Sequence, residues 1–316
     1  MADTEGKTSG KGKAPERVLA QRKELCDYFV NTIREMGGVA AWMATWKTGI
    51  ISPLNGSTEK AYRGRNRFEL ALSAAINGYD DPRWLTFNQA KKLGLSVRKG
   101  AKSSIVEKWK TFSVPSKEQV QDTDGSMKPK FFYTFPKCVG YWCVFNASDI
   151  EGIAPIERTQ SELDAFSAAD RLIATSRCAV NEGSVEAALS GCGSYSPGRD
   201  VIDMAPRGTY ADGNTFLHTL IHEMAHSTAV PLKREAKGRF GDDDYAFEEL
   251  IAELTSAFVT ADLGFSMPSD VWDDEFAKYL ASWDKILGGD PDRLFAAAGK
   301  ASAAADYIES RYNEAA

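Results

Sequence analysis

The residues of this chain best suited to chemistry lie in one short stretch, His222-Glu223-Met224-Ala225-His226. On a helix, residues four apart share a face, so His222 and His226 would present their imidazoles side by side. This spacing is typical of a catalytic zinc site, in which two imidazole nitrogens bind Zn²⁺ and the glutamate takes a proton from a water that the metal activates. We therefore predict His222 and His226 as metal ligands and Glu223 as the catalytic base.

The flanks of this motif predict a buried helix rather than a surface one. Apolar residues recur at helical spacing in the segment 215–230, at Phe216, Leu217, Leu220, Ile221, Met224 and Ala225. A five-residue pattern can also arise by chance on a surface helix. Buried imidazoles and carboxylates need partners, however, because an unpaired buried polar group costs free energy. The apolar flanks therefore favour a metal site.

A second helical pattern, in residues 247–254, offers a third ligand. Glu249 and Glu253 are four apart and share a face. We predict Glu249 as the ligand, with Glu248 as the alternative, and Glu253 as the hydrogen-bond partner of a metal-bound histidine. The competing interpretation is that acids at a helix start only complement its dipole, which explains Glu253 less well. Two histidines, one glutamate and an open position are typical of a catalytic site for Zn²⁺, with Mn²⁺ as the alternative.

Charge is distributed unevenly along the 316 residues. Residues 1–150 hold 24 Lys and Arg against 15 Asp and Glu, a net charge of +9, whereas residues 151–316 hold 14 against 29, a net charge of −15. A basic half beside an acidic half suggests that the first half meets a polyanion, although charges also cluster by chance. The length favours two domains.

Cations and aromatic side chains interleave in the first half, around Tyr62 and in a Gly-containing turn near residue 100. Single-stranded nucleic acid is held in this way, with cations on phosphates and rings under bases. The competing interpretations are a solvated basic loop and tryptophans packed in a core. The candidate DNA contacts are Lys60, Tyr62, Arg63, Arg65, Arg67, Arg98, Lys99, Lys102, Trp42 and Trp46.

The hydrophobic periodicity predicts an α+β fold in two domains. Helices are expected over residues 16–36 and 161–175, Thr86 is expected to cap a short helix, and strands are expected over 104–114, 131–135 and 139–145, with a hairpin loop over 115–130. The first domain would be a small α+β unit with a curved antiparallel sheet, and the second would be mostly helical. The predicted limits are a disordered tail over 1–15, a first domain over 16–152, a linker over 153–165 and a second domain over 166–316.

Several classes of protein are not indicated. No apolar run is long enough to cross a bilayer, and the polar start lacks the apolar core of a secretory signal. The five cysteines are scattered without close metal-type pairs, which indicates reduced thiols. We therefore expect a cytoplasmic protein without a membrane partner.

Two sets of motifs resemble a known family. The first set is Pro53-Leu54-Asn55, Tyr62-Arg63-Gly64-Arg65-Asn66, Trp84-Leu85-Thr86-Phe87-Asn88-Gln89-Ala90, Val97-Arg98-Lys99-Gly100 and Val144-Phe145-Asn146-Ala147. It resembles the N-terminal domain of ArdC-type antirestriction proteins, a domain that also occurs in TraC-type primases. The second set is Asp200-Val201-Ile202-Asp203-Met204-Ala205-Pro206, the histidine motif with its flanks over 219–228, and residues 245–253. It resembles that family's zincin-like metallopeptidase domain, and the whole resemblance covers about residues 16–312.

The resemblance implies a function. The first domain would bind single-stranded DNA without sequence specificity, and the second would have a metallopeptidase fold with a host protein as its substrate. Family members are carried by plasmids and phages and protect incoming DNA from restriction. In such folds an edge strand above the active-site helix pairs with the peptide, and residues 200–204 would supply it. Tyr245 is a candidate donor to the oxyanion.

Three points stay open. His218 stands where the family usually has an aromatic residue; it could be an extra ligand, a hydrogen-bond donor or a packed residue, and its distance of one turn favours packing. The chain could instead coat DNA and act by occlusion, with a structural or vestigial metal site. A role as a primase accessory rests on the shared domain alone.

Overall fold

The structure is a computed structural model that describes residues 14–36, 52–121, 126–156, 164–190, 193–234, 242–266, 283, 287 and 290–314. The helices are α1 (Glu16–Met36), α3 (Arg65–Asn77), α4 (Phe87–Lys92), α5 (Ala165–Ala174), α6 (Val185–Ser190), α7 (Gly213–Ser227), α8 (Asp243–Asp262) and α10 (Pro291–Glu314), with 3₁₀ turns η1 (Ala147–Asp149) and η2 (Arg207–Thr209). The strands are β1 (Leu54–Asn55), β2 (Arg83–Thr86), β3 (Ser96–Val97), β4 (Ser104–Gln121), β5 (Met127–Asn146), β6 (Ile150–Glu151), β7 (Ala179–Glu182), β8 (Gly193–Ser196) and β9 (Val201–Met204).

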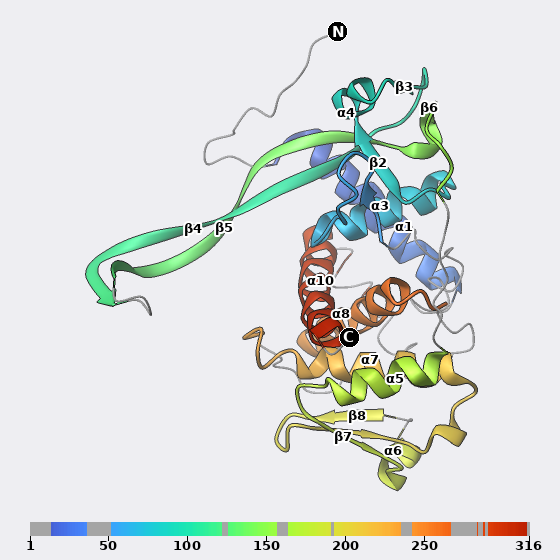
Figure 1. The fold of residues 1–316 in the computed structure, drawn as a ribbon, viewed down its shortest axis with the longest axis vertical. Helices are drawn as coiled ribbons and strands as arrows, with labels where there is room; N and C mark the ends of the chain where they lie inside the picture. The colour runs from blue at the N-terminus through green and yellow to red at the C-terminus, as the bar shows by residue number, and fades with distance from the viewer. Residues whose placement is uncertain are drawn as a thin grey trace.

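These elements form a helical body with a sheet at each end. Figure 1 shows the larger sheet extending away from the body as a long two-stranded arm, and the smaller sheet below α5 and α7. The prediction of a two-domain α+β fold with a curved sheet is confirmed, whereas the domain limits stay a prediction. Among the described residues, no helix is long and apolar enough to span a membrane.

The arm is longer than the sequence predicted. Strands β4 and β5 pair from Ser104↔Val144 out to Gln121↔Met127, so the loop predicted over residues 115–130 is wrong for most of its length. A ribbon that lies against no core has no buried face to impose an alternating pattern, and its polar outer part therefore looks like a loop in the sequence.

At the root of the arm the predicted cap is confirmed, because Thr86 and Gln89 form a reciprocal capping box at the start of α4.

The smaller sheet has the strand order β7-β9-β8. Strand β9 pairs with β7 in parallel and with β8 antiparallel, so it lies in the middle. Ile202 and Met204 of β9 are fully buried, as expected for a central strand. The prediction that residues 200–204 form the edge strand is therefore wrong, and β8 occupies the edge beside α7.

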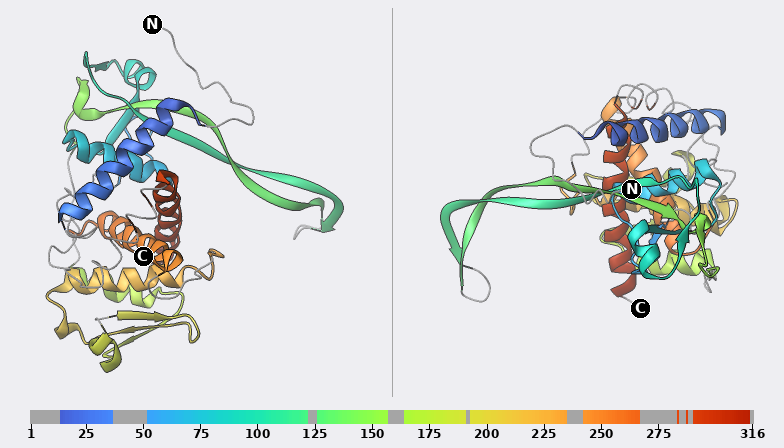
Figure 2. Two further views of the ribbon diagram at one scale, coloured as in Figure 1. Left: turned by 180° about the vertical axis from the view of Figure 1, so that it is seen from behind. Right: turned by 90° about the horizontal axis from the view of Figure 1, so that it is seen from above.

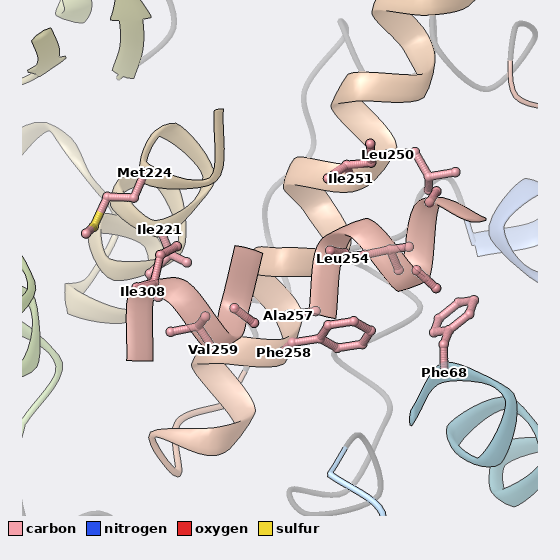
Figure 3. Close-up of a cluster of buried hydrophobic side chains, with 14 of the residues drawn as sticks. Phe68, Ile221, Met224, Leu250, Ile251, Leu254, Ala257, Phe258, Val259 and Ile308 are labelled. Carbon is pink, nitrogen blue, oxygen red and sulfur yellow. The ribbon is translucent and has the colours of Figure 1, made fainter. Parts of the chain in front are cut away.

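The main hydrophobic core lies around α8 and extends into both halves of the chain. Figure 3 shows Phe258 of α8 near Phe68 of α3, and Ile221 of α7 near Ile308 of α10. The same cluster includes Phe29 of α1, whose ring packs edge-on against that of Phe68 at 5.6 Å. Burial of this shared apolar surface holds α1 and α3 against α7, α8 and α10.

Helix α10 ties the two halves together with polar contacts as well. Asp292, near its start, pairs with the buried Arg22 of α1 at 2.6 Å. Ser302, in its middle, accepts a hydrogen bond from the backbone N–H of Gly64 at 2.8 Å. Helix α10 therefore also positions the start of α3.

Candidate metal centre

Helix α7 carries the two histidines, and its N-terminal cap and its apolar face fix how it is oriented. Asp212 caps it by accepting a hydrogen bond from the backbone N–H of Thr215 at 2.8 Å. Phe216, Leu220 and Ile221 are fully buried and turn the helix toward the core. The histidine face is thereby directed at the neighbouring helix α8.

Helix α8 presents its glutamates to the same place. Asp242 caps it by accepting from the backbone N–H of Tyr245 at 2.8 Å, and the acidic first turn complements the helix dipole. Glu248, Glu249 and Glu253 are all mostly buried, with at most 13% of each side chain exposed. Carboxylates in such a setting need cations or donors nearby.

The side chains of His222, His226 and Glu249 converge. The Nε2 atoms of the two histidines are 3.1 Å apart, and the two carboxylate oxygens of Glu249 lie 3.4 Å and 3.6 Å from them. One donor atom from each of the three residues falls within 4.8 Å of the others. Two imidazole nitrogens and a carboxylate oxygen form the ligand set of a catalytic Zn²⁺ site and also suit Mn²⁺.

The outward nitrogens of both histidines meet carboxylates. Nδ1 of His222 lies 3.1 Å from Oε1 of Glu253, and Nδ1 of His226 lies 3.6 Å from Oε1 of Glu248. A proton on each Nδ1 would leave both Nε2 lone pairs directed at the common point. The structure thus separates the glutamates: Glu249 meets the inner nitrogens, while Glu248 and Glu253 meet the outer ones.

Arg234 is a functional candidate that the sequence did not indicate. Its guanidinium donates two hydrogen bonds to the carboxylate of Glu248, with Nη2 2.6 Å from Oε1 and Nε 3.0 Å from Oε2. It also donates to the carbonyl of Ala225 at 2.9 Å, which anchors it to the end of α7. A residue eight positions after His226 in an irregular segment has no periodic relation to the motif, so no local pattern could have found it.

His218 lies one turn before the inner ligands and does not join them. Its Nε2 is 3.6 Å from Oε2 of Glu253, and its Nδ1 is 2.7 Å from the hydroxyl of Ser256. Burial lowers its pKa, which favours the neutral ring. His218 therefore packs beside Glu253, the carboxylate that meets His222, without a hydrogen bond to it.

The electrostatics of the site favour a cation. Burial alone would lower the pKa of His222, but its hydrogen bonds with Glu249 and Glu253 outweigh that effect and raise the pKa well above its usual range. Burial would likewise raise the pKa of Glu249, yet the two histidines and a hydrogen bond from Tyr245 lower it to about 2. Tyr245, which the sequence offered as a candidate oxyanion donor, thus donates a hydrogen bond to a ligand candidate, Glu249.

Glu223 lies between α7 and the edge strand β8. It is 9% exposed, and a Cβ built on Gly193 would come within 3.3 Å of its Cγ and 2.8 Å of Cγ2 of Thr219. Only a residue without a side chain lets β8 approach α7 this closely. The side chain of Glu223, the predicted base, therefore lies close to β8, on the helix that carries the candidate metal ligands.

The candidate DNA contacts are less uniform. Lys60, Arg98, Lys99 and Lys102 are exposed on loops of the first half. Trp42 and Trp46 lie outside the residues that the structure describes.

Three of the predicted contacts have partners within the protein. Arg63 is paired with Asp306 of α10, and Arg65 lies over the ring of Trp109 at 4.9 Å from its centroid. Tyr62 is half-buried against the core of the first half, where its hydroxyl accepts from Asn55 at 3.1 Å.

Arg67 does not fit the prediction of a phosphate contact. It is 3% exposed, pairs with Asp262 at 2.8 Å and 2.9 Å, and lies over the ring of Phe258 at 4.2 Å. The helical period of α3 turns this position toward α8, whereas the charge pattern alone suggested a basic surface. Arg67 is therefore a structural cation at the junction of the two halves.

Comparisons with known proteins agree with this architecture. Residues 20–135 match the model of the N-terminal domain of anti-restriction factor ArdC, and residues 167–300 match that of a zincin-like metallopeptidase. The structure is similar to the metal-free crystal structure of the antirestriction ArdC protein from plasmid R388, with a TM-score of 0.67 and 31% identity over 93% of this chain and 98% of that one. The chain belongs to the ArdC antirestriction family. The predicted resemblance is thereby confirmed.

Two relatives show how the family's parts are used elsewhere. DNA primase TraC of Escherichia coli is 31% identical over 86% of this chain, which spans only 25% of that protein. An uncharacterized protein of Sinorhizobium fredii is 30% identical over 85% of this chain and 84% of its own length. The same pair of domains thus forms most of one relative and about a quarter of another.

The R388 relative also bears on the metal. Its Mn(II)-bound crystal structure matches this chain with a TM-score of 0.65 and 30% identity, over 92% of this chain and 97% of that one. That protein therefore takes a divalent cation. The nitrogen and oxygen donors of His222, His226 and Glu249 fit such an ion.

Proposed function

We propose that this protein protects incoming DNA from restriction by combining single-stranded DNA binding with metal-dependent peptide hydrolysis. The observation that carries the proposal is the convergence of His222, His226 and Glu249, each supported by a further polar side chain, in a chain of the ArdC family. We place its action in the cytoplasm of the host bacterium, where incoming plasmid or phage DNA meets the restriction enzymes.

In this proposal His222, His226 and Glu249 hold Zn²⁺ or Mn²⁺, and Glu253 and Glu248 orient the two imidazoles. The metal would supply a Lewis acid that activates water and polarises a peptide carbonyl. Glu223 accepts a proton from the attacking water and returns it to the leaving amine. The burial of the carboxylates keeps these proton transfers away from bulk solvent.

The edge of β8 is the proposed seat of an extended substrate. An edge strand offers unpaired backbone N–H and C=O groups, to which an extended peptide can add as a further strand. Gly193 of β8 lies against Glu223, so a peptide paired there would run past the proposed base. The substrate would be a host protein segment able to become extended.

The basic first half is the proposed DNA-binding part. Its exposed cations, Lys60, Arg98, Lys99 and Lys102, can neutralise phosphates without reading bases, which gives binding without sequence specificity. Arg63 and Arg65 would contribute after exchanging their protein partners for phosphate. The competing function is protection by occlusion alone, in which the bound protein covers the DNA and hydrolyses no peptide.

A protection assay tests the proposal against occlusion. Plasmid DNA is introduced into restricting and non-restricting hosts that express the wild type, Glu223→Gln, or Arg98→Glu with Lys99→Glu, and the surviving transformants are counted. We expect Glu223→Gln to retain its metal by elemental analysis and to lose protection, while Glu16→Gln, an exposed change on α1, protects normally. If Glu223→Gln protects fully and only the charge reversal fails, occlusion is the mechanism.

A further inference from the structure

The β4–β5 arm has a face on which lysines and aromatic rings alternate. Phe112 and Phe135 are cross-strand partners whose rings stack at 5.9 Å with an angle of 24°. The next pair toward the body on the same face is Lys110↔Lys137, and Nζ of Lys137 lies 6.0 Å from the centroid of the Phe112 ring. Residues two apart on a strand share a face, so these four side chains form one surface.

The surface continues toward the root of the arm. Lys108 pairs with Gly140, and Trp142 follows two residues later on the same strand. A Cβ on Gly140 would come within 2.5 Å of Cη2 of Trp142, so the absence of a side chain at Gly140 leaves room for the indole. From Phe112 to Val106, the partner of Trp142, the strand advances about 20 Å.

These rings are exposed although they belong to a well-paired ladder. Phe112, Phe135 and Trp142 are 40%, 38% and 37% exposed, and the arm projects away from the body in each view of Figure 2. Aromatic side chains normally contribute most when buried, so their burial on binding would be favourable. A binding partner is therefore expected to cover them.

Charge identifies the kind of partner. Neither residues 108–114 nor residues 135–142 contain an Asp or a Glu, and Lys108, Lys110 and Lys137 are all exposed. A protein partner would favour a continuous apolar strip with a polar rim. Cations between flat rings instead match a flexible polyanion that carries aromatic bases.

We propose that this face of the arm, formed by Lys108, Lys110, Phe112, Phe135, Lys137 and Trp142, is a stacking platform for single-stranded DNA. The bases would lie on the Phe112–Phe135 pair and on Trp142, and the lysines between them would meet the phosphates. The inference rests on the proposed function that the chain binds single-stranded DNA, and it adds a surface beyond the basic loops proposed above.

The test measures binding of the full-length protein to labelled oligothymidylate, and to an abasic oligomer of equal length, by fluorescence anisotropy. Phe112→Leu with Phe135→Leu keeps the arm apolar and removes the rings. We expect this double variant to lose about tenfold or more in affinity for oligothymidylate, with little change for the abasic strand. Phe87→Leu, which removes a ring that is 56% exposed on α4, is the matched control and should bind like the wild type.

A second pair of variants tests the phosphate contacts. Lys110→Gln with Lys137→Gln should reduce the slope of log affinity against log salt by about 1.4, whereas Lys91→Gln with Lys92→Gln on α4 should not. Thermal melts establish that all variants are folded.

The outcomes separate this inference from the function on which it rests. If the wild type binds oligothymidylate and the Phe112 and Phe135 double variant binds within about twofold of it, the platform is wrong while DNA binding stands. If the wild type binds neither strand, the proposed DNA-binding function fails and this inference fails with it.

Discussion

The candidate metal centre and the predicted DNA-contacting residues differ in how their parts are brought together. The centre takes its inner side chains from two packed helices, and each is supported by a further polar side chain. The predicted DNA contacts lie on several loops and on α3, where Arg67 is buried and Arg63 is paired within the protein. Side chains that must converge on one point from a helix are spaced regularly in the sequence, and that spacing can be recognised. A charged surface is recognisable in the sequence only by its composition.

Removal of Glu249 should break the centre completely and is the largest effect we expect. Glu249→Ala leaves two ligands, and the metal content should fall from about one ion per chain to near none by elemental analysis. Added metal at 100 times its Kd should stabilise the wild type by about 2.7 kcal/mol and this variant not at all. Glu24→Ala, on the exposed face of α1, should keep its metal. Full metal content in Glu249→Ala would reassign the third ligand.

Removal of Arg67 should show that the other region contains a structural cation. Arg67→Ala removes the cationic partner of Asp262 at the junction with α8 and should cost about 3 kcal/mol of unfolding free energy. Urea unfolding checks this as a lower midpoint with an unchanged m-value. Arg98→Ala is the exposed counterpart and should alter stability little. A variant of normal stability with weak DNA binding would restore Arg67 to the DNA-binding surface.

Removal of either outer carboxylate should weaken metal binding without abolishing it. Glu253→Ala removes the partner of His222 Nδ1, and Glu248→Ala removes that of His226. Each should lower metal affinity about 10- to 100-fold while one ion per chain still binds at saturation. Competition with a chelating dye measures both values. Complete loss of binding in Glu248→Ala would make it a ligand in place of Glu249.

Glu69 is a buried carboxylate in the first half that, unlike the glutamates of the candidate metal centre, has no hydrogen-bond partner among the described residues. Burial beside Glu107 raises its pKa to about 8. A folded-state pKa above the unfolded one contributes stability that is complete below about pH 4.5 and is lost as pH rises toward 8.

Glu69→Gln removes this titration. Relative to the wild type, the variant should therefore gain stability on going from pH 5 to pH 8.5, by up to about 4 kcal/mol. Parallel thermal melts at the two pH values measure the difference, and Glu24→Gln should show none. Equal differences at both pH values would mean that Glu69 is ionised in the folded protein.

Much of the metal centre was predictable because helical spacing is local. The spacing of His222 and His226, and that of Glu249 and Glu253, placed each pair on one helix face before any packing was known. The family motifs likewise lie within short stretches. The sequence could not separate the tasks of Glu248 and Glu249, since adjacent residues on one helix differ only by a rotation that packing against α7 decides.

The arm and the smaller sheet show the opposite case. Strands β4 and β5 pair far beyond the apolar alternation that predicted them, because backbone hydrogen bonds need no particular side chains. The central place of β9 follows from its pairing with β7 and β8, which are separated from it in sequence. Neither fact has a local signal.

By itself the sequence predicted the two helices that carry the candidate metal ligands, the types of those ligands and the family, since all three depend on the types and spacing of nearby residues. The tertiary structure alone decided which carboxylate meets the inner nitrogens, that Arg234 holds Glu248, and that Arg67 is buried at the junction with α8. The physical reason is the distance in sequence over which each kind of signal acts. Periodicity reports which face of an element is apolar, but only packing reports which element that face meets.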